Sequence, residues 1–66
     1  MVITVIYQKE EHKKEIEGNI TIKEVLDLMH IPSESAVVKK NNEIVMDEEI
    51  LEDHDLIEVI LVIYGG

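Results

Sequence analysis

The chain contains no cysteine, no arginine and only one proline among its 66 residues. Without cysteine it can form neither a disulfide framework nor a thiolate metal site, and it has no cysteine nucleophile. No stretch approaches the ~18 apolar residues that a membrane-spanning helix requires. The apolar run after Met1 is six residues long and precedes the first lysines, which is not the order of a signal peptide. We therefore expect a cytoplasmic protein without a membrane segment.

Positive charge is scarce. Six lysines stand against fifteen Asp and Glu residues, which gives a formal net charge of −9. Because phosphate binding needs a basic surface, this balance argues against nucleic acid as a partner. It favours basic protein partners, although an acidic surface also serves solubility alone. We expect the chain to be a monomer.

The short chain limits how much core can form. Residues 1–66 suffice for a single domain. A domain of this size buries only about 60% of the surface that its unfolded chain exposes. The core must therefore be small, and the stability modest.

Apolar patterning divides the chain into strands and one helix. β-branched and alternating apolar residues indicate strands, and polar or Asn-rich breaks indicate turns. The predicted elements are a strand over 1–7, a hairpin turn over 8–12, a second strand over 13–18, a helix within 19–32, two strands within 36–46 around the Asn41–Asn42 turn, an acidic connection over 47–55 with room for one helical turn, and a final strand over 56–63.

The helix has the clearest signals at its two ends. Thr21 and Glu24 form the Thr-x-x-Glu pattern of a capping box, which marks a helix start. Pro32 restricts the residue before it to extended geometry, so the helix should end near His30. Apolar residues recur between these points at helical spacing: Ile22, Val25, Leu26 and Met29.

One helix among five strands restricts the possible architectures. The apolar stripe of a single helix is buried most economically against one face of a mixed sheet. The first and last strands are the most apolar, so they should lie side by side in the centre of the sheet. The prediction is an α+β, β-grasp (ubiquitin-like) fold, with a mixed sheet of about five strands packed on one helix.

The final strand is apolar on both faces. Alternate residues of a strand point to opposite faces, and large apolar side chains occur in both alternating sets. One set, which includes Ile60 and Val62, should remain on the open face of the sheet together with residues of the first strand. Such a patch on a small domain indicates a contact site, although over half of any protein surface is apolar.

Two glycines follow the strand that we place mid-sheet. We expect residues 64–66 to form a flexible tail that carries the carboxylate of Gly66 away from the body of the protein. Glycine lacks Cβ, so its backbone can approach another protein closely. A carboxylate on this tail could enter a narrow channel that a bulky side chain would block.

These segments resemble the small β-grasp sulfur carriers, the ThiS and MoaD family, which includes archaeal ubiquitin-like modifiers. The resemblance covers the whole chain and is closest in length to ThiS. Its most specific part runs from Val37 to Gly66. The residues that carry it are MVITVIY at the start, TIKEVLDLM in the helix, VVKKNNEIVMDEEILEDHDLIEVILVIYGG and, above all, the terminal Gly65–Gly66.

The resemblance implies a carrier that is not an enzyme and has no catalytic residue, metal site or bound cofactor. A partner adenylating (E1-like) enzyme uses ATP and Mg²⁺ to activate the Gly66 carboxylate. A sulfur donor then converts it to a thiocarboxylate. A downstream biosynthetic enzyme of thiamine, molybdopterin or tRNA thiolation pathways receives the sulfur. In this scheme Gly65 supplies clearance, and Ile60, Val62 and Tyr64 help to dock the partner.

Two other functions remain open. The first is a ubiquitin-like modifier that is conjugated to lysines through Gly66. The second is a passive β-grasp interaction module whose tail is never activated. Two departures from the family also matter: His54 stands where relatives often have a turn glycine and should adopt a positive φ, and Tyr64 stands where relatives have a smaller residue.

The remaining polar residues favour simpler interpretations. Metal binding by His54 with its acidic neighbours lacks the alternating ligands and turn glycine of a calcium loop. Hydrolase chemistry from Ser33 or Ser35 lacks a Gly-x-Ser-x-Gly setting. The other assignments are that Lys39 and Lys40 are solvated and that Met29 and Met46 pack in the core.

Overall fold

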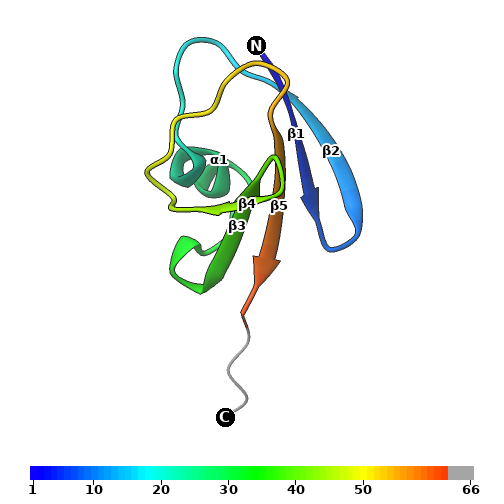
Figure 1. Ribbon diagram of the computed structural model, residues 1–66, viewed down its shortest axis with the longest axis vertical. Helices are drawn as coiled ribbons and strands as arrows, with labels where there is room; N and C mark the ends of the chain where they lie inside the picture. Colours follow the sequence, from blue (N-terminus) through cyan, green and yellow to red (C-terminus); the bar gives the residue numbers. More distant parts are fainter. Residues whose placement is uncertain (63–66) are drawn as a thin grey trace.

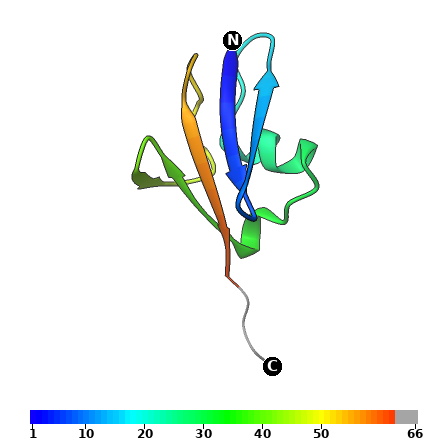
Figure 2. The ribbon, with the colours of Figure 1, turned by 90° about the vertical axis from the view of Figure 1, so that its right-hand side faces the viewer.

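The computed structural model describes residues 1–62, and residues 63–66 lie outside the described part. A five-stranded mixed sheet carries one α-helix on one of its faces (Figures 1 and 2). The elements are β1 (Val2–Tyr7), β2 (Glu10–Glu15), α1 (Ile22–Leu28), the 3₁₀ turn η1 (Ser33–Ser35), β3 (Ala36–Lys40), β4 (Glu43–Val45) and β5 (Leu56–Leu61).

The strands lie in the order β2-β1-β5-β3-β4. β1 and β5 are parallel neighbours, and each pairs antiparallel with a strand on its other side. The most apolar strands therefore lie together inside the sheet, as the sequence predicts. The α+β, β-grasp architecture is confirmed.

The core lies between the sheet and α1. Ile3 and Val5 of β1 and Ile57 and Val59 of β5 point toward the helix and are at most 5% exposed. The alternating residues on the opposite face are more exposed, and Ile60 of β5 is 41% exposed. The remaining buried apolar side chains are Ile20, Ile22, Val25, Leu26, Ile31, Val38 and Leu51.

The capping box at the start of α1 is confirmed. The backbone N–H of Glu24 donates to the Thr21 hydroxyl at 3.3 Å, and the backbone N–H of Thr21 donates to the Glu24 carboxylate at 3.2 Å. The helix ends at Leu28 with Met29 as its C-cap. His30 then adopts a left-handed φ of 60°, so the helix ends slightly before the predicted position.

The acidic connection 47–55 contains no helical turn, contrary to the expectation. Its backbone carbonyls are instead used by α1: the N–H of Ile22 donates to Glu49 and the N–H of Lys23 donates to Asp47, at 3.0 and 2.9 Å. The first N–H groups of a helix have no partner within the helix. The connection consists of turns and short irregular stretches, and its carbonyls supply these partners.

Three smaller predictions were wrong. The hairpin turn consists of Gln8 and Lys9 alone, so β2 begins at Glu10 and ends at Glu15. Met46 is 73% exposed and does not pack in the core, whereas Met29 does contact it. Lys40 is also not simply solvated, because its side chain is only 18% exposed.

A buried carboxylate joins the two turns that precede β4 and β5. Asp55 is 6% exposed and accepts hydrogen bonds from the Asn41 side chain and the Glu52 backbone, at 2.9 and 2.7 Å. The Asn41 side-chain oxygen in turn accepts from the backbone N–H of Leu56 at 3.0 Å. This network determines where β5 begins.

Candidate functional site

The end of β5 is held on one side only. Its pairing with β1 stops at Val59, which lies opposite Tyr7, whereas its pairing with β3 continues to Leu61 opposite Ala36. Beyond Val59, the side of β5 that faced β1 has no strand beside it among the described residues. The lower end of β5 in Figure 1 therefore projects past its neighbour β1.

One further hydrogen bond supports the chain just beyond the end of β5. The backbone N–H of Val62 donates to the carbonyl of Ser35, at the end of η1, over 2.7 Å. Val62 is therefore anchored although it lies outside the strand. The sequence does not predict this role of Ser35, because the acceptor is its backbone carbonyl, which every residue type has. The one signal nearby was Pro32, which indicates a turn.

A groove lies beside this end of β5, on the side that β1 leaves free. The β1–β2 turn forms one end of it, with Gln8 and Lys9 at φ values of 53° and 66°. Lys9 and Glu58 supply opposite charges, and the rest of the lining is largely apolar. The groove is lined by Ile6, Tyr7, Gln8, Lys9, Glu58, Val59, Ile60 and Leu61.

Apolar side chains on the open face of the sheet separate into two groups. Ile60, which is 41% exposed, lies opposite Val37 of β3 near the end of β5. Leu56, which is 42% exposed, lies opposite Thr4 of β1 at the other end of the strand. Glu58 stands between them, with Ile6 and Lys39 as its strand neighbours. On β5 and β3 the two groups are thus separated by the charged side chains Glu58 and Lys39, whereas on β1 the apolar Ile6 lies in the same row.

The structure describes two of the five predicted site residues. Ile60 lies on the open face and lines the groove, and Val62 is half-buried and anchored to Ser35. Tyr64, Gly65 and Gly66 lie outside the described residues. The proposed roles of all five residues stay predictions.

The acidic turn before β5 contains His54, the residue considered for metal binding. His54 has a φ of 67°, which confirms the predicted positive value, and its imidazole Nε2 lies 3.3 Å from the Asp53 carboxylate. Within residues 1–62, no group of three or more His, Asp or Glu side chains is placed to hold a metal ion. The described helices also include none long and apolar enough to cross a membrane.

Comparison with known proteins identifies a family and a similar solved structure. The family model described as "ThiS family" matches residues 3–66. A crystal structure of a thiamine biosynthesis protein (ThiS) from Geobacter metallireducens is similar in fold, with a TM-score of 0.70 and 23% sequence identity. That alignment covers 100% of this chain and 99% of the Geobacter chain.

The family match settles the general class of function. Carriers of this family bind no cofactor themselves, and an activating enzyme is their implied partner. The expectation that the chain is not an enzyme is confirmed, because the family's members are non-catalytic. With a match that spans all but its first two residues, the chain belongs to the ThiS family of sulfur carriers.

Proposed function

We propose that this carrier delivers sulfur to thiamine biosynthesis as a thiocarboxylate on Gly66. A partner adenylating enzyme would join the Gly66 carboxylate to the α-phosphate of ATP and release pyrophosphate. A sulfur donor at the oxidation level of sulfide would then displace AMP and leave sulfur in place of one carboxylate oxygen. ATP and Mg²⁺ belong to the partner, and the need for ATP fits a cytoplasmic location.

The observation that carries the proposal is the one-sided support of β5. The strand is anchored by β3 and Ser35 as far as Val62, which is four residues before Gly66 in the sequence. A rigid support this close to the reactive group would limit how far that group wanders from a docked enzyme, which lowers the entropy lost on binding. Thiamine is favoured among the sulfur pathways by the ThiS family match and by the name of the Geobacter structure.

The same end of the molecule offers a docking surface for the activating enzyme. Ile60 is exposed beside a groove, and the oppositely charged residues Lys9 and Glu58 also line that groove. Apolar side chains surrounded by polar groups are typical of the energetically important part of an interface. The overall charge of −9 would also speed encounter with a basic enzyme face.

Intact-mass measurement tests the chemistry. The full chain is incubated with its activating enzyme, ATP, Mg²⁺ and a sulfide source, and the expected product is heavier by the difference between sulfur and oxygen. A chain lacking Gly65 and Gly66 should show no such gain. Conjugates on lysine side chains would instead support a protein modifier. A deletion variant that keeps full function in cells would show a passive interaction module.

A matched pair of variants tests the docking surface. Ile60→Lys and Leu56→Lys alter the same face of β5 at residues that are 41% and 42% exposed. We expect Ile60→Lys to lower kcat/KM for adenylation about 10- to 100-fold, as for a well-placed interface residue, and Leu56→Lys to have a much smaller effect. Equal losses in the two variants would contradict docking at the end of β5.

A further inference from the structure

The most exposed apolar side chains near the sheet lie at the other side of the molecule from the β1–β5 groove. Ile44 in β4 is 71% exposed, Met46 just after it is 73% exposed, and Ile50 in the acidic connection is 55% exposed. All three are more exposed than Ile60, which is 41% exposed. We call these three residues the β4 surface.

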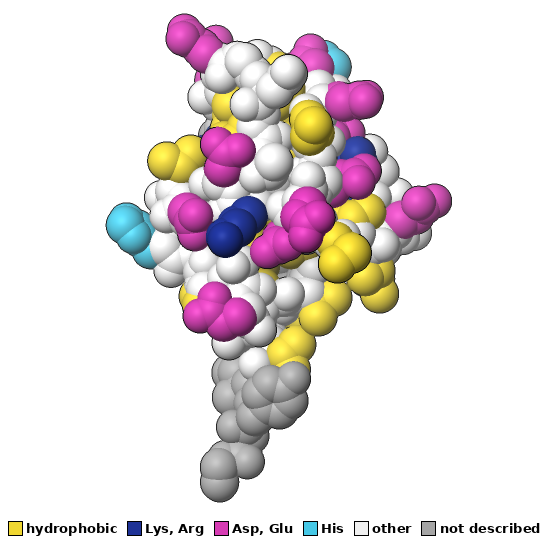
Figure 3. Space-filling view, turned by 90° about the vertical axis from the view of Figure 1, so that its left-hand side faces the viewer, with side chains coloured by type: hydrophobic (Ala, Val, Ile, Leu, Met, Phe, Trp, Pro, Cys, Tyr) yellow, Lys and Arg dark blue, Asp and Glu magenta, His cyan; other side chains and the backbone are white. Residues whose placement is uncertain are grey.

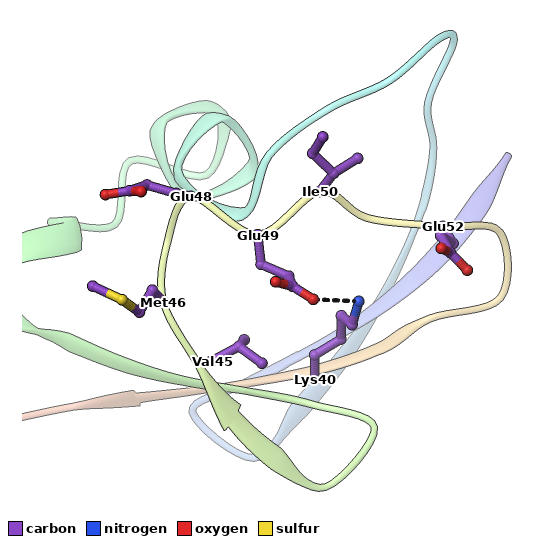
Figure 4. A pocket seen from close by; sticks show the side chains of 7 residues that line it. All are labelled: Lys40, Val45, Met46, Glu48, Glu49, Ile50 and Glu52. Carbon is purple, nitrogen blue, oxygen red and sulfur yellow. Dashed lines mark hydrogen bonds and ion pairs between the residues drawn. The ribbon is translucent and has the colours of Figure 1, made fainter.

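Two hollows border β4 and share two lining residues, the last residue of β4 and the residue after it. Val45 and Met46 line both of them. Figure 4 shows the first hollow, in which Lys40 and Glu49 point toward one another and Met46 and Ile50 lie at its border. The second hollow is lined by Ile44 and by residues of β3. The β4 surface is therefore indented and suited to receive side chains.

β4 also has a free edge. It is the last strand of the sheet and pairs only with β3 among the described residues. The two-residue turn Asn41–Asn42 makes Lys40 and Glu43 a hydrogen-bonded pair, so Ile44 occupies the following non-hydrogen-bonded position opposite Lys39. The backbone N–H and C=O of Ile44 consequently point away from β3, where an added strand could bond to them.

The charge around the β4 surface is one-sided. The segment from Glu43 to Asp55 contains seven acidic residues and neither lysine nor arginine. Two lysines of β3 lie close to it: Lys39 stands opposite Ile44, and Lys40 donates a hydrogen bond to Glu49 at 2.9 Å and lies 3.9 Å from Asp55. The hydrogen bond to Glu49 raises the pKa of Lys40, so this lysine stays charged and offsets acidic charge locally.

Among the described residues, Glu48 and Glu52 beside the β4 surface form no ion pair with a lysine. Figure 3 shows Asp and Glu side chains spread among hydrophobic ones on the flank that carries α1, with few lysines between them. A second copy of this chain would bring another net charge of −9 to this acidic border. Like charges brought together oppose association, so a basic occupant fits better than a second copy.

We propose that the β4 surface is a second protein-docking site, which takes an extended segment of a partner protein in which apolar residues alternate with Lys or Arg. The segment adds to the free edge of β4. Its apolar side chains cover Ile44 and Met46, and its basic side chains point to the other face, where their aliphatic stems lie over Ile50 and their charges meet the carboxylates of the first hollow. Because β5 and β3 separate this edge from β1, a partner bound here leaves the β1–β5 groove accessible.

An NMR titration of the full chain with synthetic peptides tests the proposal. The probe is a peptide of alternating valine and lysine, and the control peptide has serine in place of each valine. The probe should cause saturable shifts of the amide signals of Ile44, Met46 and Ile50, and the serine peptide should not. Added salt should weaken binding because exposed charges are screened.

Matched variants separate the apolar and charged contributions. Met46→Ser and Ile50→Ser should each weaken the peptide about tenfold, whereas Leu28→Ser, which changes a side chain 68% exposed on α1, should leave affinity unchanged. Glu48→Gln should also weaken binding, and Glu11→Gln on β2 should not.

Several results would overturn the proposal. These are the absence of saturable shifts, equal effects of the two peptides, and shifts centred on Ile60 in place of the β4 surface. Sedimentation showing a dimer that Met46→Ser dissociates would identify a second copy as the occupant. Because the titration requires neither ATP nor the tail, its failure would leave the thiocarboxylate proposal standing.

Discussion

Among residues 1–62, six non-glycine residues adopt a left-handed backbone conformation: Gln8, Lys9, His30, Asn41, Asn42 and His54. A positive φ brings Cβ close to the carbonyl oxygen and costs about 1–2 kcal/mol for most residues, although Asn and His tolerate it better than most. His54 keeps this conformation because its N–H donates to the carbonyl of Val2 at 2.7 Å. The bond joins the turn before β5 to the start of β1.

Replacing His54 by glycine should stabilise the protein. Glycine removes the Cβ strain at φ 67° but loses more backbone entropy on folding, so we expect a net gain of about 0.5–1 kcal/mol. Chemical denaturation at neutral pH measures the change. His54→Ala is the control, because alanine has the strain without the polar side chain, and it should give no gain. A stabilised alanine variant would show that the imidazole itself is unfavourable there.

Asp53 makes the fold sensitive to acid. Its carboxylate accepts a hydrogen bond from the backbone N–H of Val2 at 2.7 Å, and this bond lowers the pKa of Asp53 in the folded protein. A lowered pKa means that the stabilisation is present above the ordinary value of 3.8 and is lost as the pH falls through the lower folded value.

The Asp53→Asn variant should therefore lose stability at neutral pH and show a shallower decline below pH ~4 than the wild type. Thermal melts from pH 2 to pH 7 measure both effects. Glu34→Gln changes an exposed carboxyl group in η1, at the opposite end of β5 from this turn, and serves as the control. Parallel acid branches for wild type and Asp53→Asn would contradict the assigned role of this carboxylate.

α1 depends on contacts outside its own seven residues. Isolated helices of this length are unstable in water. The capping box satisfies the N–H of Glu24, and carbonyls of the acidic connection satisfy those of Ile22 and Lys23. Thr21 also forms an isolated antiparallel bridge with Ile50. The start of the helix and the acidic connection consequently stabilise one another.

The Thr21→Ala variant should lose about 1 kcal/mol, the usual effect of removing an N-cap hydroxyl. Urea denaturation followed by circular dichroism measures the loss. Thr21→Ser keeps the hydroxyl and should retain most of the stability. If both variants were equally destabilised, the threonine methyl group and not the cap would be the important part.

Residues 1–62 form one small apolar core between the sheet and α1. Domains of this size have a net stability of only about 3–5 kcal/mol from one core. The two faces of β5 contribute very differently to this stability. Ile57 is 1% exposed and contacts the core, whereas Ile60 is 41% exposed on the open face.

The Ile57→Ala variant should cost about 2–5 kcal/mol, which is comparable with the total stability, so a large fraction should be unfolded at 25 °C. Ile60→Ala should change stability by about 0.5 kcal/mol or less. Amide hydrogen exchange and thermal melts of both variants measure the contrast. Similar losses of stability in the two variants would mean that Ile60 and the open face around it are covered in solution.

The sequence by itself determined the class of fold and the order of the strands and the helix, although the limits of β2 and the end of α1 differ from the prediction. The strands, the Asn41–Asn42 turn and the capping box depend on neighbouring residues, so local patterns reveal them. The positive φ of His54 was also predictable, because this residue stands at a turn position where relatives often have glycine. Local patterns likewise identified the candidate residues Ile60 and Val62, since alternation along one strand separates its two faces.

Only the tertiary structure decided how these elements support one another. The bond from Val62 to Ser35 and the placement of Asp55 beside Asn41 join residues far apart in the chain. The exposure of Met46 depends on β4 being the sheet edge, which its own sequence does not specify. The physical reason is common to all three cases: a backbone carbonyl, a side-chain carboxylate or an uncovered edge acquires its role from what the fold places next to it.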